Sequence, residues 1–72
     1  MITIQNIQIR LAEAIKQSGL TQTEIANRLN INSTQICSYI KGRKMPAIDT
    51  LANLCVILDL DANEILCVTE NR

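Results

Sequence analysis

The sequence predicts a compact all-α domain of five short helices. In five stretches, apolar residues recur at the i, i+3 and i+4 spacing of a helix that buries one face. Three of these stretches follow a Thr, Asn or Asp of the kind that caps helix starts. Hydrophobic residues make up 47% of the 72, yet they include one Tyr and no Phe or Trp. The core is therefore expected to consist of Ile and Leu, in one small domain that oligomerisation would help to stabilise.

The first helix is predicted over residues 4–18, and Ser18-Gly19 ends it. Ile2 and Ile9 lie off its apolar stripe and are expected to be exposed, as isolated surface residues. A dimer contact is the alternative for these two side chains. The residues expected on the buried stripe are Ile4, Ile7, Leu11, Ala14 and Ile15.

Two further helices, joined by a tight turn, are predicted over residues 21–42. Thr21 and Glu24 form a Thr-x-x-Glu capping box at the start of the first. Asn30 is expected to end it, because Asn tolerates the left-handed conformation found at helix ends. The buried residues expected here are Ile25, Ala26 and Leu29, with Ile31 as an apolar plug in the turn.

The second of these helices is predicted to have one apolar and one polar side. Asn32 is expected to cap it, with Gln35 as the reciprocal partner. Ile36, Tyr39 and Ile40 are expected to be buried. Uncharged hydrogen-bonding residues crowd the other side over its first turn and a half, which is the part that a helix-turn-helix protein inserts into the DNA major groove. These candidate base-reading residues are Ser33, Thr34, Gln35 and Ser38.

A basic loop follows, and then a fourth helix over residues 48–58. Gly42 supplies the positive φ of a helix end. Ala47 occupies the cap position of the fourth helix and caps poorly, and Asp59, which follows that helix, can adopt the left-handed conformation at some cost. The residues expected to be buried are Ile48, Leu51, Ala52, Leu54, Cys55 and Leu58.

A fifth helix is predicted over residues 62–66, with Asp61 and Glu64 as a capping box. Leu60, Ile65 and Leu66 are expected to close the core. Residues 67–72 are expected to form a frayed tail, so the domain spans residues 1–66.

The motifs of the chain resemble those of the lambda-repressor/Cro-like helix-turn-helix family, also called the XRE family. The resemblance covers about residues 7–66. The residues that carry it are Gly19-Leu20-Thr21-Gln22-x-Glu24-Ile25-Ala26, Leu29-x-Ile31-x-x-x-x-Ile36, Lys41-Gly42-Arg43-x-x-Pro46, Thr50-Leu51 and Leu58-x-Leu60-x-x-x-Glu64-Ile65-Leu66.

This resemblance implies a lambda-repressor-like fold whose second and third helices form the helix-turn-helix. By family position, Ser33, Thr34 and Ser38 match residues that often touch bases. Members often bury an ion pair between an Arg of the first helix and a Glu of the third, where this chain has Ile15 and Ile40. Because replacing both charges with packed apolar residues is often neutral, Ile15 is predicted to contact Ile40.

Two groups of residues are expected to hold DNA phosphates. Gln22 opens a helix, whose N-terminal N–H groups and positive dipole end can bind an anion. Thr23 and Asn27 are expected to assist it. The second group lies in the loop that runs along the DNA backbone in the family, although a solvated basic loop is the alternative; it consists of Lys41, Arg43 and Lys44.

The charges of the chain sum to zero but are unevenly distributed. Residues 1–44 hold six cations against two carboxylates, whereas residues 45–72 hold one cation against five carboxylates. Such a split suggests one face that meets phosphate and one that avoids it.

The composition argues against several other classes of function. The chain has no histidine, and its three cysteines form no C-x-x-C pair, so neither a metal site nor a disulfide framework is expected. No base accompanies Cys37, so this cysteine is not expected to be catalytic. No other catalytic residue, enzyme activity, cofactor or small-molecule ligand is expected. No apolar run approaches a membrane span and no signal peptide is visible, which predicts a cytoplasmic protein.

These features predict a sequence-specific transcription regulator, most simply a repressor, that binds double-stranded DNA as a homodimer. The alternative is a protein-interaction or antitoxin module of the same fold, with a protein as its main partner. The zero net charge and the uncharged candidate reading surface favour that alternative to some degree.

Overall fold

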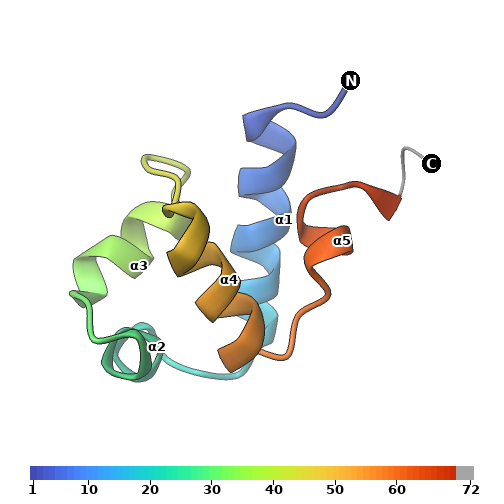
Figure 1. The fold of residues 1–72 in the computed structure, drawn as a ribbon. Coiled ribbons are helices and arrows are strands. Elements are labelled where there is room, and N and C mark those ends of the chain that lie inside the picture. The colour runs from blue at the N-terminus through green and yellow to red at the C-terminus, as the bar shows by residue number, and fades with distance from the viewer. Residues whose placement is uncertain (70–72) are drawn as a thin grey trace.

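The computed structural model describes residues 1–69, which contain five helices and no strand. α1 packs against α3 and α5, and α2 packs against α3 and α4, so that α1 stands between α3 and α5 (Figure 1). The predicted all-α fold is confirmed. Three of the predicted ranges are one residue too long, because their last residues are the C-caps Ser18, Leu58 and Leu66. The helices are α1 (Ile4–Gln17), α2 (Gln22–Leu29), α3 (Ser33–Ile40), α4 (Ile48–Ile57) and α5 (Ala62–Ile65).

Aliphatic side chains from all five helices form one core. Leu11, Ile25, Ile36 and Leu54 are the largest fully buried side chains, each from a different helix. Ile15 is also buried, and Ile40 is half-buried against the same core. The direct contact between these two residues stays a prediction. The other buried members are Ala26, Tyr39 and Ile65.

Some residues expected in the core are exposed instead. Ile48 is 88% exposed and Ala52 is also exposed, while Leu54 of the same helix is fully buried. Two apolar stripes run along α4, and only the stripe with Leu51, Leu54, Cys55 and Leu58 meets the core. Ile4 is exposed as well, because the first turn of α1 projects beyond its neighbours (Figure 1).

Helix starts follow the predicted caps only in part. The Thr21–Glu24 capping box is confirmed, and Thr3 forms a second box with Asn6 at the start of α1. Asn32 occupies the N-cap of α3, but its side chain makes no cap hydrogen bond, so the predicted pairing with Gln35 is wrong. The predicted Asp61–Glu64 box is also wrong.

The Asp61 side chain instead accepts a hydrogen bond from the backbone N–H of Asn63 at 2.9 Å. Ala47 makes no side-chain cap, as predicted.

Four of the five helices end through the same backbone motif. A residue with positive φ follows each helix, and the next N–H donates to a carbonyl five residues back. Asn30, Gly42 and Asp59 take this conformation as predicted. Cys67 also takes it, with φ 62, and is 4% exposed. The prediction of a frayed tail is therefore wrong at Cys67, because the end of α5 holds it in the interior.

The rest of the predicted tail is only partly described. Residues 70–72 lie outside the described residues, and the domain boundary at residue 66 stays a prediction. Among residues 1–69, no helix is long and apolar enough to cross a lipid bilayer.

Replacing Asp59 with Gly is expected to stabilise the fold. Asp59 is exposed with φ 54, a backbone conformation that costs most side chains roughly 1–2 kcal/mol and Gly almost nothing. Asp59→Gly should raise the midpoint of thermal unfolding by about 4 °C or more. Asn53→Gly, within α4, is the control and should lower it, because Gly disfavours a helix interior. A midpoint that falls in both variants would contradict this reading of Asp59.

Candidate nucleic-acid interface

The turn between α2 and α3 is short and anchored to the core. Asn30 is left-handed, with φ 57 and ψ 44, and the N–H of Ile31 donates to the carbonyl of Ala26 at 3.0 Å. Ile31 is half-buried against the core, as the sequence predicts for an apolar plug. This turn fixes the direction in which α3 leaves α2.

The apolar side of α3 is buried and its polar side is accessible. Ile36 is fully buried and Tyr39 is 7% exposed, so the opposite side of the helix faces solvent. Thr34 and Gln35 are exposed, whereas Ser33 and Ser38 are half-buried. All four predicted base-reading residues are therefore accessible on one helix. Because Gln35 takes no part in capping, its amide group is available to other partners.

The hydroxyl of Ser38 already has an internal partner. Its Oγ donates to the carbonyl oxygen of Thr34 at 3.1 Å, one turn earlier in the helix. The hydrogen of this hydroxyl is thus used within α3, while the lone pairs of Oγ stay available to accept a hydrogen bond from outside.

The predicted phosphate-binding residues lie on both sides of α3 in the chain, and all six are exposed. The first group is on α2, which packs against α3, and the second is in the loop that follows α3. Pro46 is buried at the far end of that loop. The residues are Gln22, Thr23 and Asn27 on α2, and Lys41, Arg43 and Lys44 in the loop.

The basic loop begins with a well-defined helix end. The N–H of Gly42 donates to the carbonyl of Tyr39 at 3.2 Å, and the N–H of Arg43 donates to that of Ser38 at 2.9 Å. In addition, Nε2 of Gln8 on α1 donates to the carbonyl of Gly42 at 3.2 Å. No sequence pattern predicts this last contact, because the two residues are 34 positions apart.

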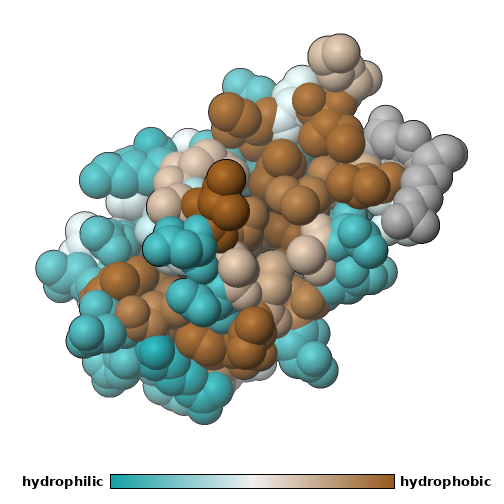
Figure 2. All heavy atoms as spheres, viewed as in Figure 1, coloured by the Kyte–Doolittle hydropathy of each residue, from teal (hydrophilic) through white to brown (hydrophobic). Residues whose placement is uncertain are grey.

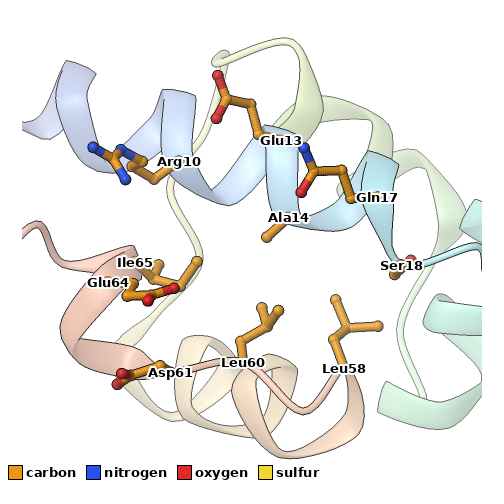
Figure 3. Close-up of a pocket in the computed structure, with 10 residues that line it drawn as sticks. All are labelled: Arg10, Glu13, Ala14, Gln17, Ser18, Leu58, Leu60, Asp61, Glu64 and Ile65. Atoms are coloured by element: carbon orange, nitrogen blue, oxygen red, sulfur yellow. The ribbon is translucent and has the colours of Figure 1, made fainter.

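A hollow of about 330 Å³ between α1 and α5 is mainly acidic, in contrast to the basic loop. Ala14, Leu58 and Leu60 point toward one another across it (Figure 3). Glu13, Asp61 and Glu64 line it together with Arg10. Because three carboxylates against one guanidinium disfavour an anion, this hollow does not suit a nucleic-acid phosphate.

The cysteines give no sign of a catalytic or metal site among residues 1–69. Cys37 and Cys55 have free thiols, Cys67 is buried with its Sγ 3.9 Å from the carbonyl oxygen of Ile65, and no group of His, Cys, Asp and Glu in this range could hold a metal ion. Burial, with a smaller effect from the Asp61 carboxylate, raises the pKa of the Cys55 thiol. That thiol stays protonated at neutral pH and is a poor nucleophile.

Comparison with known proteins places these features in a family. Residues 9–70 match the model of a helix-turn-helix domain. The chain is 34% identical over 55 residues to the ImmF control region 10 kDa protein of Bacillus phage phi105, an alignment that covers 76% of this chain and 60% of that protein. It is 33% identical over 57 residues to the HTH-type transcriptional regulator ImmR of Bacillus subtilis strain 168, covering 79% of this chain and 45% of that protein.

The chain thus spans about three fifths of the first of these relatives and less than half of the second. No solved structure matches the chain.

The capping box of α2 is expected to contribute measurably to the stability of the interface. The backbone N–H of Glu24 donates to the Thr21 hydroxyl at 3.1 Å, and the N–H of Thr21 donates to the Glu24 carboxylate at 3.4 Å. Thr21→Ala should lower the free energy of unfolding by about 1 kcal/mol in urea titrations. Thr23→Ala, also exposed but without a capping role, is the control. Equal losses in the two variants would contradict the assignment.

Proposed function

The chain belongs to the helix-turn-helix family and is an XRE-type member of it, and on this premise we propose that it is a sequence-specific DNA-binding repressor of transcription. In this proposal α3 enters the major groove of an operator. The observation that carries it is the accessible, uncharged polar side of α3, flanked in the chain by exposed phosphate-binding candidates.

The side chains of α3 supply hydrogen bonds of defined kinds. Gln35 can bond adenine with both atoms of its amide, and the methyl group of Thr34 can pack on a thymine methyl. With its hydrogen donated to Thr34, Ser38 would accept a hydrogen bond from the amino group of adenine or cytosine. Ser33, half-buried beside them, has a hydroxyl that suits several partners.

The base preference follows from what α3 lacks. Ser33–Ile40 contains no Arg or Lys, so the common bidentate contact to guanine is missing. The operator is therefore proposed to be richer in A·T than average. DNA shape and deformability would supply part of the discrimination.

Phosphate contacts would position the domain on the duplex. Two groups supply them, one on α2 and one in the loop after α3. One copy that makes so few contacts would bind weakly, and each contact from a Lys or Arg is expected to steepen the salt dependence by a slope of about 0.9. A homodimer on a palindromic operator would overcome this weakness. The residues proposed for these contacts are Gln22, Thr23, Asn27, Lys41, Arg43 and Lys44.

An exposed apolar surface is available for the second copy. Apolar side chains gather over α4 and α5 on the face seen in Figure 2. Val56 of α4 is 79% exposed, and an apolar groove of about 140 Å³ runs between Ile48 of α4 and Leu66 beyond α5. Burying this surface between two copies would remove it from water. The same surface favours the second candidate function, a module whose main partner is another protein.

Negative charge introduced at the proposed interface is expected to weaken DNA binding. In mobility-shift measurements with duplex DNA, Ser33→Glu and Lys44→Glu should each lower the affinity by about tenfold or more at low salt. Lys44→Glu should also reduce the steepness of the salt dependence. Gln17→Glu, which adds the same single charge as Ser33→Glu at the acidic hollow beside α1, is the control and should bind as the unsubstituted chain does. Absence of any shift with the unsubstituted chain would favour the protein-interaction module.

Selection of bound sequences from a random DNA pool is expected to yield an A·T-rich inverted repeat. The two half-sites should be centred about 10 base pairs apart, or a multiple of that, if two copies bind on one side of the duplex. A G-rich consensus would overturn the inferred base preference. A single unrepeated half-site would overturn the dimer.

A further inference from the structure

The contact between Gln8 and Gly42 links the N-terminal half of α1 to the exit of α3. Nε2 of Gln8 donates to the Gly42 carbonyl oxygen at 3.2 Å, and the Gln8 side chain is half-buried. The cap and turn hydrogen bonds of side chains described above join residues no more than four positions apart. The Gln8 contact is therefore a tertiary contact and not part of a local turn.

The carbonyl that accepts the hydrogen bond from Gln8 lies where the backbone leaves α3 and enters the basic loop. Gly42 has φ 72, and its carbonyl belongs to the peptide unit that leads into Arg43. The N–H of that same unit donates back to the carbonyl of Ser38 at 2.9 Å. Both polar atoms of one peptide plane are thus held, one by α3 and the other by α1. A peptide plane fixed at both atoms sets the direction in which the chain continues to Arg43 and Lys44.

The surroundings of the hydrogen bond between Gln8 and Gly42 indicate that it affects the position of the basic loop more than the stability of the fold. Gln8 lies on the wall of an open groove of about 480 Å³ between α1 and the end of α3, which Gln5, Lys16 and Lys41 also line. Water can reach such a hydrogen bond and compete for both groups, so its net contribution to folding is small. Ordering the loop before binding, by contrast, lowers the conformational entropy that binding must remove.

We propose that Gln8 is a positioning residue, which pre-orders the basic loop so that Arg43 and Lys44 are directed toward the DNA backbone. This inference rests on the proposed function and adds to it a residue of α1 that itself need not touch DNA. It requires that the effect of Gln8 on binding pass through the cations of the loop and not through the residues of α2.

The variant Gln8→Met tests this role, because it removes the amide donor and keeps the length and helix preference of the side chain. Gln5→Met is the matched control, on the same helix and the same groove. With a short duplex of mixed sequence at low salt as the probe, Gln8→Met should weaken binding by about threefold, since ordering the loop now opposes binding. Gln5→Met should have no effect, and circular dichroism should give the same helix content in both variants.

A double-mutant cycle separates positioning from a general loss of stability. The effect of Gln8→Met should shrink toward zero in an Arg43→Ala, Lys44→Ala background, because the loop then has no cation to direct. In a Gln22→Ala background the full effect should remain, because Gln22 lies on α2. Equal effects in the two backgrounds would overturn the proposal.

The amide resonances of the loop give a readout that needs no DNA. Backbone order at Arg43 and Lys44, measured by NMR relaxation on the free chain, should fall in Gln8→Met and stay unchanged in Gln5→Met. Unchanged order in Gln8→Met would overturn the positioning role. If the unsubstituted chain binds no duplex, the proposed function fails, while this measurement still decides whether Gln8 orders the loop.

Discussion

Burial of one side of α3 is the constraint on which the rest of the structure depends. An isolated helix of eight residues does not persist in water, so α3 exists because its apolar side packs against α1 and α2. Ile36 and Tyr39 are the buried residues of this side and belong to the common core. At about 100° per residue, Thr34 and Ser38 then lie opposite the buried stripe, and Ser33 and Gln35 lie at its flanks. The packing that creates the helix therefore also decides which side chains it presents.

The distribution of charge complements this packing. The core is aliphatic, and no buried charge is among the described residues. Exposed cations follow α3 in the chain, whereas Asp49, Asp59, Asp61 and Glu64 are exposed on α4, α5 and the connection between them. A molecule with zero net charge can thus still attract a polyanion to its exposed cations. Screening at physiological salt limits the electrostatic repulsion from the exposed carboxylates to a range of about 8 Å.

Much of the fold could be predicted from the sequence, because its determinants are local. The Thr21–Glu24 box and the left-handed Asn30 depend on residues within four positions of each other, and both are confirmed. The apolar spacing likewise located all five helices. The exposure of Thr34 and Gln35 follows from the same spacing, since it places Ile36 on the buried side.

The capping boxes predicted at Asn32 and Asp61 failed within local motifs, and the other errors lie where the tertiary arrangement decides. α4 has two apolar stripes, and the pattern alone does not tell which of them meets the core, so Ile48 was misplaced. Cysteine has no preference for positive φ, so the positive φ of Cys67 is explained only by the packing of this residue at the end of α5. The contact from Gln8 to Gly42 joins residues that the sequence does not bring together. The roles of Ser33, Thr34, Gln35 and Ser38 toward DNA stay predictions, because accessibility does not identify a partner.

The most direct test of the central claim is an NMR titration of the isotope-labelled chain with duplex DNA. Backbone amide shifts are predicted to concentrate at the start of α3, the start of α2 and the loop from Lys41 to Lys44, with little change at Glu13 and Gln17 beside the acidic hollow. Shifts concentrated in α4 and α5, with α3 unchanged, would contradict the claim that the polar side of α3 is the surface that meets DNA.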